Sequence, residues 1–396
     1  MKRILALVGV CLTTLLTGFA QSQPVYYSAE AAQWADSLLQ KMPIEQKLGQ
    51  LFMVAAYSNR GPEHKKAIEK LVKDEHIGGL IFMQGGPVRQ AHLNNHYQKL
   101  SNIPLLIGMD AEWDLAMRLD STFKFPWAMS VGAVQDSALI YQMGVKMGEH
   151  CKRLGVHISF SPVMDINTNP KNPIINARSF GQDRNNVVQK SRALMHGLQD
   201  AGVLACGKHF PGHGDTEADS HKTLPQVNHD EQRLAEVEMY PYDKLIDQGL
   251  ASVMVAHLDV PQLDSTGKPA SLSRQIVTGV LKEQLGFNGL IITDALNMKG
   301  VSSKYAPGDV DLEAFKAGND ILLFAEDVPK AKAKIMAAIS KEEVTMAELD
   351  ARARKVLMAK YHLGLNKKQY VDTENLVADL NGRIFIAFRI DRHIDK

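Results

Sequence analysis

The loop formed by residues 208–221 carries a dense group of chemically active side chains. It contains three histidines and two aspartates. The apolar run at residues 202–207 precedes it and is typical of a buried strand. Pro211, Gly212 and Gly214 then exclude a regular element from the loop. Titratable side chains directly after a buried strand indicate a catalytic loop in a parallel α/β fold.

Two interpretations of this loop do not involve acid–base catalysis. The first is a metal site, with ligands drawn from His209, His213, Asp215, Asp219 and His221. Histidines four positions apart share a face only on a helix, which Pro211 and Gly212 prevent, and Phe210 stands where a zinc protease has glutamate. The second is a polar loop whose histidines only satisfy backbone groups. Three histidines exceed what a short loop needs for structure alone, so both interpretations are disfavoured.

The third interpretation is acid–base catalysis by Asp219 and His221. A carboxylate two residues from an imidazole can accept a hydrogen bond from one ring nitrogen, which favours the protonated ring. The other nitrogen is then free to give a proton to a leaving group. A partner nucleophile or base is available in Asp294, which ends the apolar run at 289–293 and should lie at the same rim. Asp294 could equally be a helix N-cap, and its position in the sequence leaves both roles open.

Several segments together resemble glycoside hydrolase family 3, in its β-N-acetylhexosaminidase branch. Residues 208–225 match the long signature of this branch, and the other matching segments follow the family's order. These are Ser161–Asp165, Asn176–Gly181, Val253–His257, Leu285–Gly289 and Thr293–Met298. The resemblance covers about residues 40 to 365. It implies a retaining hydrolase that acts on terminal β-linked N-acetylglucosamine.

The resemblance also implies catalytic roles. Asp294 aligns with the nucleophile that forms a covalent glycosyl-enzyme, and His221, paired with Asp219, aligns with the acid/base. Most glycosidases use a second carboxylic acid in that position, but a histidine needs less adjustment of its pKa to work near neutrality. The residues implied to bind the ring hydroxyls are Asp110, Arg118, Arg178, Lys208 and His209.

The segment after Asp110 departs from the family's pattern. The family continues with Gln-Glu-Gly-Gly, whereas this chain has Ala111, Glu112, Trp113 and Asp114. The departure puts the shape of this loop and the fit of the leaving group in doubt. Trp113 could stack on the face of a sugar, or it could pack within the loop.

Apolar runs alternate with helical patterns along most of the chain. The runs are Leu51–Ala55, Gly79–Met83, Pro104–Gly108, His157–Phe160, Leu204–Cys206, Ser252–Ala256, Leu290–Thr293 and Asp320–Phe324. Helical patterns between them include His64–His76, Ser137–Leu154, Asn185–Ala201 and Asp230–Gln248. Eight strands alternating with helices predict an α/β fold of the (β/α)8 TIM-barrel type with extra C-terminal helices. A doubly wound sheet is the alternative, but no Gly-rich phosphate loop follows the first run.

Polar side chains stand at or just past the ends of five predicted strands. They are Asp110, Asp165, Lys208 with His209, His257 and Asp294. Loops begin at strand ends, which explains one or two polar residues there but explains five less well. In a barrel these groups would converge on one rim, as barrel enzymes require.

The chain divides into three predicted parts. Residues 1–20 have a basic start and an apolar centre, which indicate a signal peptide and an exported, periplasmic or extracellular protein. Residues 25–365 form the predicted barrel domain. Its last helix begins at a capping box formed by Thr345 and Glu348. Residues 366–396 are expected to be a poorly ordered tail, either the end of a single-domain form or the start of a truncated further domain. Cys151 and Cys206 are expected to be buried thiols.

Composition is that of an ordinary globular protein. The sequence is 45% hydrophobic and 22% charged, with a formal net charge of +1. This balance suggests no nucleic-acid partner and no stable membrane insertion after signal removal. We expect an enzyme without metal or cofactor that removes N-acetylglucosamine from carbohydrates such as peptidoglycan fragments. Phosphorolysis of the same glycosides and an inactive sugar-binding scaffold are the alternatives.

Overall fold

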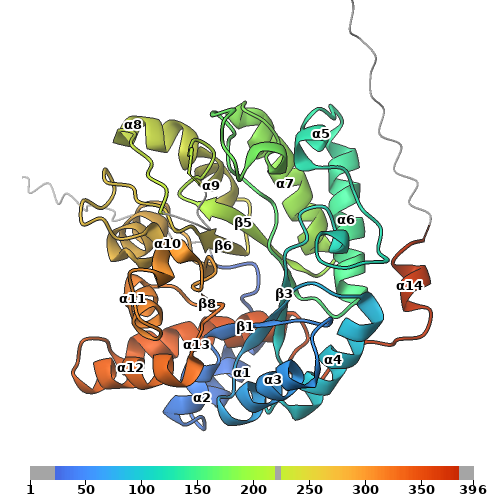
Figure 1. The fold of residues 1–396 in the computed structure, drawn as a ribbon, viewed down its shortest axis with the longest axis vertical. Coiled ribbons are helices and arrows are strands. Elements are labelled where there is room, and N and C mark those ends of the chain that lie inside the picture. The colour runs from blue at the N-terminus through green and yellow to red at the C-terminus, as the bar shows by residue number, and fades with distance from the viewer. Residues whose placement is uncertain (1–22, 219–223, 383–396) are drawn as a thin grey trace, which may run out of the picture.

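The computed structural model describes residues 23–218 and 224–382, and these form a barrel of parallel strands surrounded by helices (Figure 1). The strands are β1 (Phe52–Ala56), β2 (Gly79–Phe82), β3 (Leu106–Met109), β4 (Ile158–Ser159), β5 (Leu204–Phe210), β6 (Ser252–Val255), β7 (Leu290–Thr293) and β8 (Leu322–Leu323). Their order in the sheet is β7-β6-β5-β4-β3-β2-β1-β8. The gap between β7 and β8 is bridged because Thr293 N donates to Ile321 O at 3.1 Å and Leu296 N donates to Leu323 O at 2.9 Å. The predicted (β/α)8 barrel is therefore confirmed.

The helices lie around the outside of the barrel. Those before β5 are α1 (Ala29–Leu39), α2 (Ile44–Gly49), α3 (Pro62–Asp74), α4 (Pro87–Leu100), η1 (Leu115–Met117), α5 (Ala128–Gly132), α6 (Ser137–Arg153), η2 (Asn176–Arg178) and α7 (Arg184–Asp200). Those after it are α8 (Glu231–Arg233), η3 (Leu234–Glu238), α9 (Tyr240–Ile246), η4 (Ala270–Leu272), η5 (Gln275–Gln284), α10 (Lys299–Ser302), α11 (Asp309–Ala317), α12 (Val328–Ser340), α13 (Met346–His362) and α14 (Leu376–Asp379). The capping box at Thr345 and Glu348 opens α13 as predicted.

Burial explains why these runs form strands. Nearly every strand residue is buried, as expected for parallel strands covered by helices on one side and filling the barrel on the other. Cys151 and Cys206 are buried free thiols, as predicted. Helices α6 and α7 pack closely because Gly197 lies against the backbone of α6. A Cβ atom there would stand 2.2 Å from Tyr141 O.

Two segments differ from expectation. The predicted helix at 230–248 is divided into α8, the π-helical η3 and α9, and Pro241 stands in the first turn of α9. Residues 366–382 are packed against the barrel, in contrast to the poorly ordered tail that was expected. Leu376 and Leu380 are buried. Arg153 holds this segment through Asp379 Oδ2 at 2.8 Å and Glu374 O at 2.7 Å.

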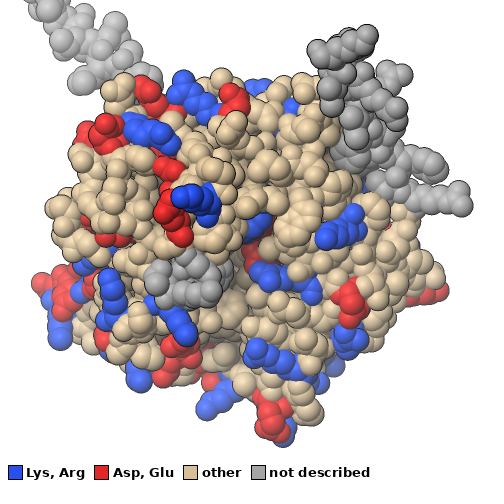
Figure 2. Space-filling view, turned by 45° about the horizontal axis from the view of Figure 1, so that its top comes forward, with Lys and Arg blue, Asp and Glu red and all other residues tan. Residues whose placement is uncertain are grey.

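The surface carries both signs of charge. Acidic and basic side chains are interspersed over the face drawn in Figure 2, in keeping with the near-zero formal charge. Among residues 23–218 and 224–382, no helix is both long enough and apolar enough to span a bilayer.

Candidate active site

The sequence-predicted residues meet at the carboxyl ends of the strands. Asp110 directly follows β3, and Asp294 directly follows β7. Lys208 and His209 lie near the carboxyl end of β5. Parallel strands bring their carboxyl ends to one rim of a barrel, so residues up to 184 positions apart can share a site. The peptide bond between Lys208 and His209 is cis.

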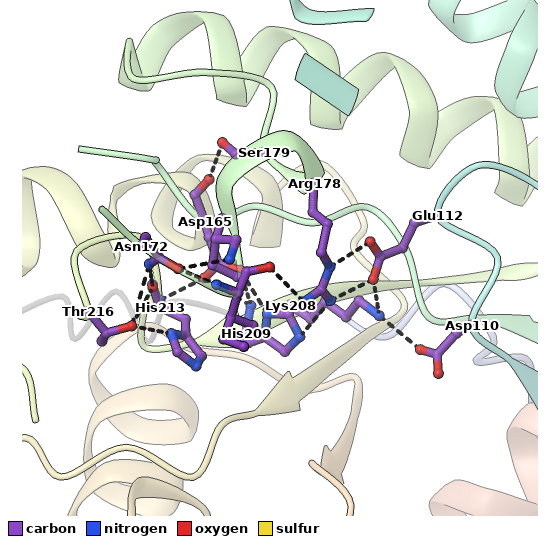
Figure 3. A network of polar contacts seen from close by, with 12 residues as sticks. Asp110, Glu112, Asp165, Asn172, Arg178, Ser179, Lys208, His209, His213 and Thr216 are labelled. Atoms are coloured by element: carbon purple, nitrogen blue, oxygen red, sulfur yellow. Dashed lines mark hydrogen bonds and ion pairs between the residues drawn. The ribbon is translucent and has the colours of Figure 1, made fainter. Parts of the chain in front are cut away.

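The centre of the site is a cluster of five charged side chains, Asp110, Glu112, Arg118, Arg178 and Lys208. Figure 3 shows all of them except Arg118. Lys208 Nζ lies 2.9 Å from Asp110 Oδ1 and 2.8 Å from Glu112 Oε1. Arg178 binds Glu112 with two nitrogens, at 2.9 Å and 2.7 Å, in the bidentate geometry that gives strong charge-assisted hydrogen bonds. Arg118 donates to the other oxygen of Asp110. Two carboxylates and three cations therefore hold one another in place.

Mutual pairing keeps these groups ionised although they are buried. Burial raises the pKa of Asp110, but Lys208 and Arg118 hold it far below its usual value. Burial likewise opposes ionisation of Glu112, but Arg178 and Lys208 lower its pKa to about 2. Burial alone would lower the pKa of Lys208, yet the two carboxylates raise it. The cluster thus offers fixed charges at any physiological pH.

Asp165 organises the other side of the site. Its carboxylate accepts a hydrogen bond from His213 N at 2.7 Å and lies 2.7 Å from His209 Nδ1. Arg178 lies 3.4 Å from His209 Nε2, and since a guanidinium can only donate, Nε2 is the acceptor and Nδ1 carries the hydrogen that Asp165 accepts. Burial lowers the pKa of His213 to about 4, so its ring is neutral. His213 Nδ1 lies 2.6 Å from Thr216 Oγ1.

Asp294 remains reachable from outside, since its side chain is partly exposed while those of β7 before it are buried. Its Oδ1 accepts a hydrogen bond from Ala295 N at 2.8 Å. Burial raises its pKa, but electrostatic interaction with the imidazoles of His257 and His209 and the backbone hydrogen bond from Ala295 N lower it below its ordinary value. Helix α10 begins only at Lys299, so Asp294 is not an N-cap. Asp294 is therefore an ionised carboxylate at the rim.

The predicted pair Asp219 and His221 lies outside the described residues. Asp215, at the start of their loop, was one of the residues in the metal interpretation. Its Oδ2 lies 2.5 Å from His229 Nε2. Asp215, His229 and Glu238 bring ligand-type atoms within 4.8 Å of one another. Arg233 donates to Glu238 at 3.1 Å and lies 3.8 Å from Asp215, so an arginine already balances these carboxylates.

The departure at Trp113 and Asp114 has a structural explanation. Asp114 has φ +74° and ψ −175°, a backbone conformation that glycine adopts easily and other residues rarely adopt. Its buried carboxylate accepts from Leu115 N at 2.8 Å and lies 2.6 Å from His150 Nδ1. Trp113 packs against Trp127, with ring centroids 4.1 Å apart. Trp113 therefore packs on a ring from another segment, the one that precedes α5.

Two residues of the site were not assigned a role from the sequence. Glu112 joins Lys208 to Arg178, and its position two residues after Asp110 at a strand end was the available signal. Asp165 was noted only as a polar strand end, yet it orients His209 and the loop after it.

This arrangement suits a polyhydroxylated ligand. Each sugar hydroxyl both donates and accepts, and the site sets carboxylate acceptors beside lysine and arginine donors. Asp110 and Arg118 are partly exposed, so their remaining hydrogen-bonding capacity can reach a ligand. The ionised carboxylate of Asp294 stands at the same rim. The geometry therefore favours binding of a sugar ring beside this carboxylate.

Comparison with known proteins gives a consistent result. Residues 43–359 match the glycosyl hydrolase family 3 N terminal domain. The chain is 36% identical over 293 residues to beta-hexosaminidase A of Pseudoalteromonas piscicida, covering 68% of this chain and 48% of that protein. It therefore spans about half the length of this relative.

Two solved structures resemble the fold closely. A family 3 beta-N-acetylglucosaminidase from Paenibacillus sp. str. FPU-7 has a TM-score of 0.78 and 31% identity, covering 86% of this chain and 68% of that one. A beta-glucoside phosphorylase has a TM-score of 0.84 and 26% identity, covering 91% of this chain and 66% of that one.

Proposed function

Because the chain belongs to glycosyl hydrolase family 3, we propose that it is a retaining β-N-acetylhexosaminidase that removes terminal β-linked N-acetylglucosamine. The observation that carries the proposal is the place of Asp294. It is an ionised, partly exposed carboxylate at the rim that also bears the Asp110, Lys208 and Arg178 cluster. A nucleophile must be ionised and must face the anomeric carbon of a fixed sugar, and the charge of Asp294 beside this cluster supports that role.

The reaction proceeds in two steps. The carboxylate of Asp294 attacks the anomeric carbon while the bond to the leaving oxygen breaks and His221 gives that oxygen its proton. Water then attacks the glycosyl-enzyme, gives a proton to His221 and restores the carboxylate of Asp294. Asp219 orients the imidazole of His221. The roles of Asp219 and His221 rest on the sequence resemblance.

The sugar is held by the charged cluster. Asp110, Arg118, Arg178, Lys208 and His209 bind its ring hydroxyls in this proposal. Their pairing fixes them before the substrate arrives, so little side-chain freedom is lost on binding. Glu112 holds Lys208 and Arg178 in register without needing to touch the sugar.

The substrate and its location form a further part of the proposal. The basic start and apolar centre of residues 1–20 support export to the periplasm or beyond. An exported enzyme of this specificity would meet peptidoglycan fragments. Fractionation of the source cells tests the location: activity in the exported fraction supports it, and activity confined to the cytoplasm contradicts it.

The test of the reaction is turnover of nitrophenyl N-acetyl-β-glucosaminide beside nitrophenyl β-glucoside. We expect hydrolysis of the first to be at least about tenfold more efficient, since the N-acetyl group adds specific contacts. An Asp294→Asn variant, which keeps the shape and removes the charge, serves as the control for activity at this site. No turnover of either substrate by the unchanged protein would leave a sugar-binding scaffold as the function.

Phosphorolysis is a second candidate function, and the likeness to a beta-glucoside phosphorylase motivates it. The same Asp294 would form the glycosyl-enzyme, and phosphate would take the place of water. Analysis of the products with and without phosphate separates the two. Free N-acetylglucosamine in both cases supports hydrolysis, whereas a sugar 1-phosphate formed only with phosphate supports phosphorolysis.

A further inference from the structure

Two tryptophans form an aromatic pair at the rim beside the charged cluster. The rings of Trp113 and Trp127 have centroids 4.1 Å apart and are tilted by 43°. Trp127 is 39% exposed, although a large indole is ordinarily kept mostly out of water. One side of the exposed ring therefore rests against Trp113.

The two rings come from segments that flank one ion pair of the site. Trp113 directly follows Glu112, and Trp127 directly precedes α5. Helix α5 packs on η2, which carries Arg178. Asn186 Nδ2 donates to Gly132 O of α5 at 3.0 Å and to Phe180 O at 3.1 Å. Since Glu112 and Arg178 are bonded to each other, the aromatic pair adjoins their end of the site.

The backbone holds Trp113 firmly in this place. Phe125 N donates to Trp113 O at 3.4 Å, and the next residue, Asp114, is fixed by its buried contact with His150. The supporting ring is therefore part of a rigid loop, and rigid aromatic groups bind with a small loss of conformational freedom.

The ammonium group of Lys124 lies close to both rings, while Trp127 stays 39% exposed. Lys124 Nζ lies 5.2 Å from the Trp127 centroid and 5.8 Å from the Trp113 centroid. An ammonium group beyond the outer face of Trp127 would lie much farther from Trp113 than from Trp127. The similar distances place Lys124 beside the pair instead, where it does not cover that face.

We propose that the Trp113–Trp127 pair is an accessory subsite on which a second sugar ring of the glycan stacks, next to the ring held by the charged cluster. The flat face of a pyranose presents C–H groups that pack against an aromatic face. This inference rests on the proposed function, and it adds that the enzyme selects glycans of at least two rings. Trp127 provides the contact face, and Trp113 positions it.

The test compares a substrate with two rings and one with a single ring. Diacetylchitobiose has a second ring, whereas N-acetylglucosaminyl fluoride has only the ring that reacts and a small leaving group. We expect Trp127→Ala to lower kcat/KM on diacetylchitobiose about five- to tenfold, and to change it less than about twofold on the fluoride. Trp127→Phe, which keeps an aromatic face, should retain most of the preference.

A matched control is Tyr370→Ala, which removes another exposed aromatic side chain, 56% exposed and at the opposite end of the barrel, where it lies near Gly155. It should change neither substrate. Equal losses on both substrates in Trp127→Ala, or no loss on diacetylchitobiose, would overturn the subsite while leaving the hydrolase intact. Inactivity of the unchanged protein on both substrates would overturn the proposed function, and the subsite with it.

Discussion

The Nζ atom of Lys208 lies 2.8 Å from the Oε1 atom of Glu112, and both side chains are almost fully buried. An unpaired buried ammonium or carboxylate costs free energy of desolvation, and the attraction between the two groups offsets that cost. Arg178 closes the cluster from the other side of Glu112. The carboxylate of Glu112 thus links β5, which carries Lys208, to η2, which carries Arg178.

The first prediction concerns the ion pairs that Glu112 forms with Lys208 and Arg178. Glu112→Gln keeps the shape of the side chain but leaves Lys208 and Arg178 short of one negative charge. We expect the free energy of unfolding to fall by about 3 kcal/mol, the usual cost of breaking a buried pair. We also expect kcat/KM to fall, because two sugar-binding groups lose their anchor. Urea unfolding and steady-state kinetics measure the two effects.

Glu63→Gln is the control for this change, because Glu63 pairs with Lys66 while 88% of its side chain is exposed. Solvent screens such a pair, so no measurable change in stability is expected. If Glu112→Gln were as stable as Glu63→Gln, the buried cluster would not be held together by charge.

The second prediction concerns Asp114 and the loop that it shapes. Asp114→Asn keeps the shape of the side chain but loses the charge that faces His150, and should cost about 1–3 kcal/mol. Asp114→Ala should cost about 1 kcal/mol more, since it also removes the side-chain oxygen that accepts from Leu115 N. Chemical unfolding ranks the variants, with the exposed Asp120→Asn as the reference. Equal stability of Asp114→Ala and the unchanged protein would refute this account of the loop.

The third prediction concerns the proton donor. His221→Ala should lower turnover of diacetylchitobiose at least about a hundredfold, because a sugar alkoxide leaves poorly without a proton. Nitrophenolate leaves without one, so the nitrophenyl glycoside should lose far less in the first step. The exposed His92→Ala should change neither. Equal losses on both substrates in His221→Ala would argue against a proton-donor role.

The fourth prediction concerns a buried lysine far from the site in sequence. Lys360 is fully buried, and its Nζ lies 2.6 Å from Gln50 Oε1. Burial lowers the pKa of Lys360 to about 7. Lys360→Met removes a buried cation, so the variant should be more stable by on the order of 1–4 kcal/mol below pH 7.

The sign of the pH dependence follows from the two pKa values. The unfolded chain keeps a lysine pKa near the ordinary value of about 10.4, so between about pH 7 and pH 10 it binds more protons than the folded chain. Stability of the unchanged protein should therefore rise with pH in that window, and its deficit relative to Lys360→Met should shrink. Urea unfolding at pH 6 and pH 9 measures the gap, with Lys341→Met as the exposed control. A gap that widens toward pH 9 would contradict the prediction.

Much of the fold could be predicted because strands and helices have different hydrophobic periods. The apolar runs are the strands, and their alternation with helical patterns requires parallel pairing. The helix at 230–248 could not be predicted in detail, because its division at Met239 depends on local backbone choices around Pro241. The packing of residues 366–382 depends on long-range contacts such as Arg153 with Asp379, which a local pattern does not contain.

For the site, the sequence indicated which strand ends meet, but it did not indicate how the side chains pair there. Convergence of Asp110, Lys208 and Asp294 follows from parallel strands that end at one rim. The bond between Glu112 and Arg178 joins positions 66 apart through two loops, and no local signal indicates such a pairing. The positive φ of Asp114 was predictable in principle, since aspartate stands where the family has a glycine.

The most direct test of the account is to trap the covalent intermediate. A 5-fluoro N-acetylglucosaminyl fluoride slows both steps because its ring fluorine withdraws electrons, while its activated leaving group lets the glycosyl-enzyme form and accumulate. Mass spectrometry of the digested protein should then find one sugar on the peptide that contains Asp294, and none in the Asp294→Asn variant. A label on another carboxylate, or turnover with no covalent species at all, would contradict the central claim.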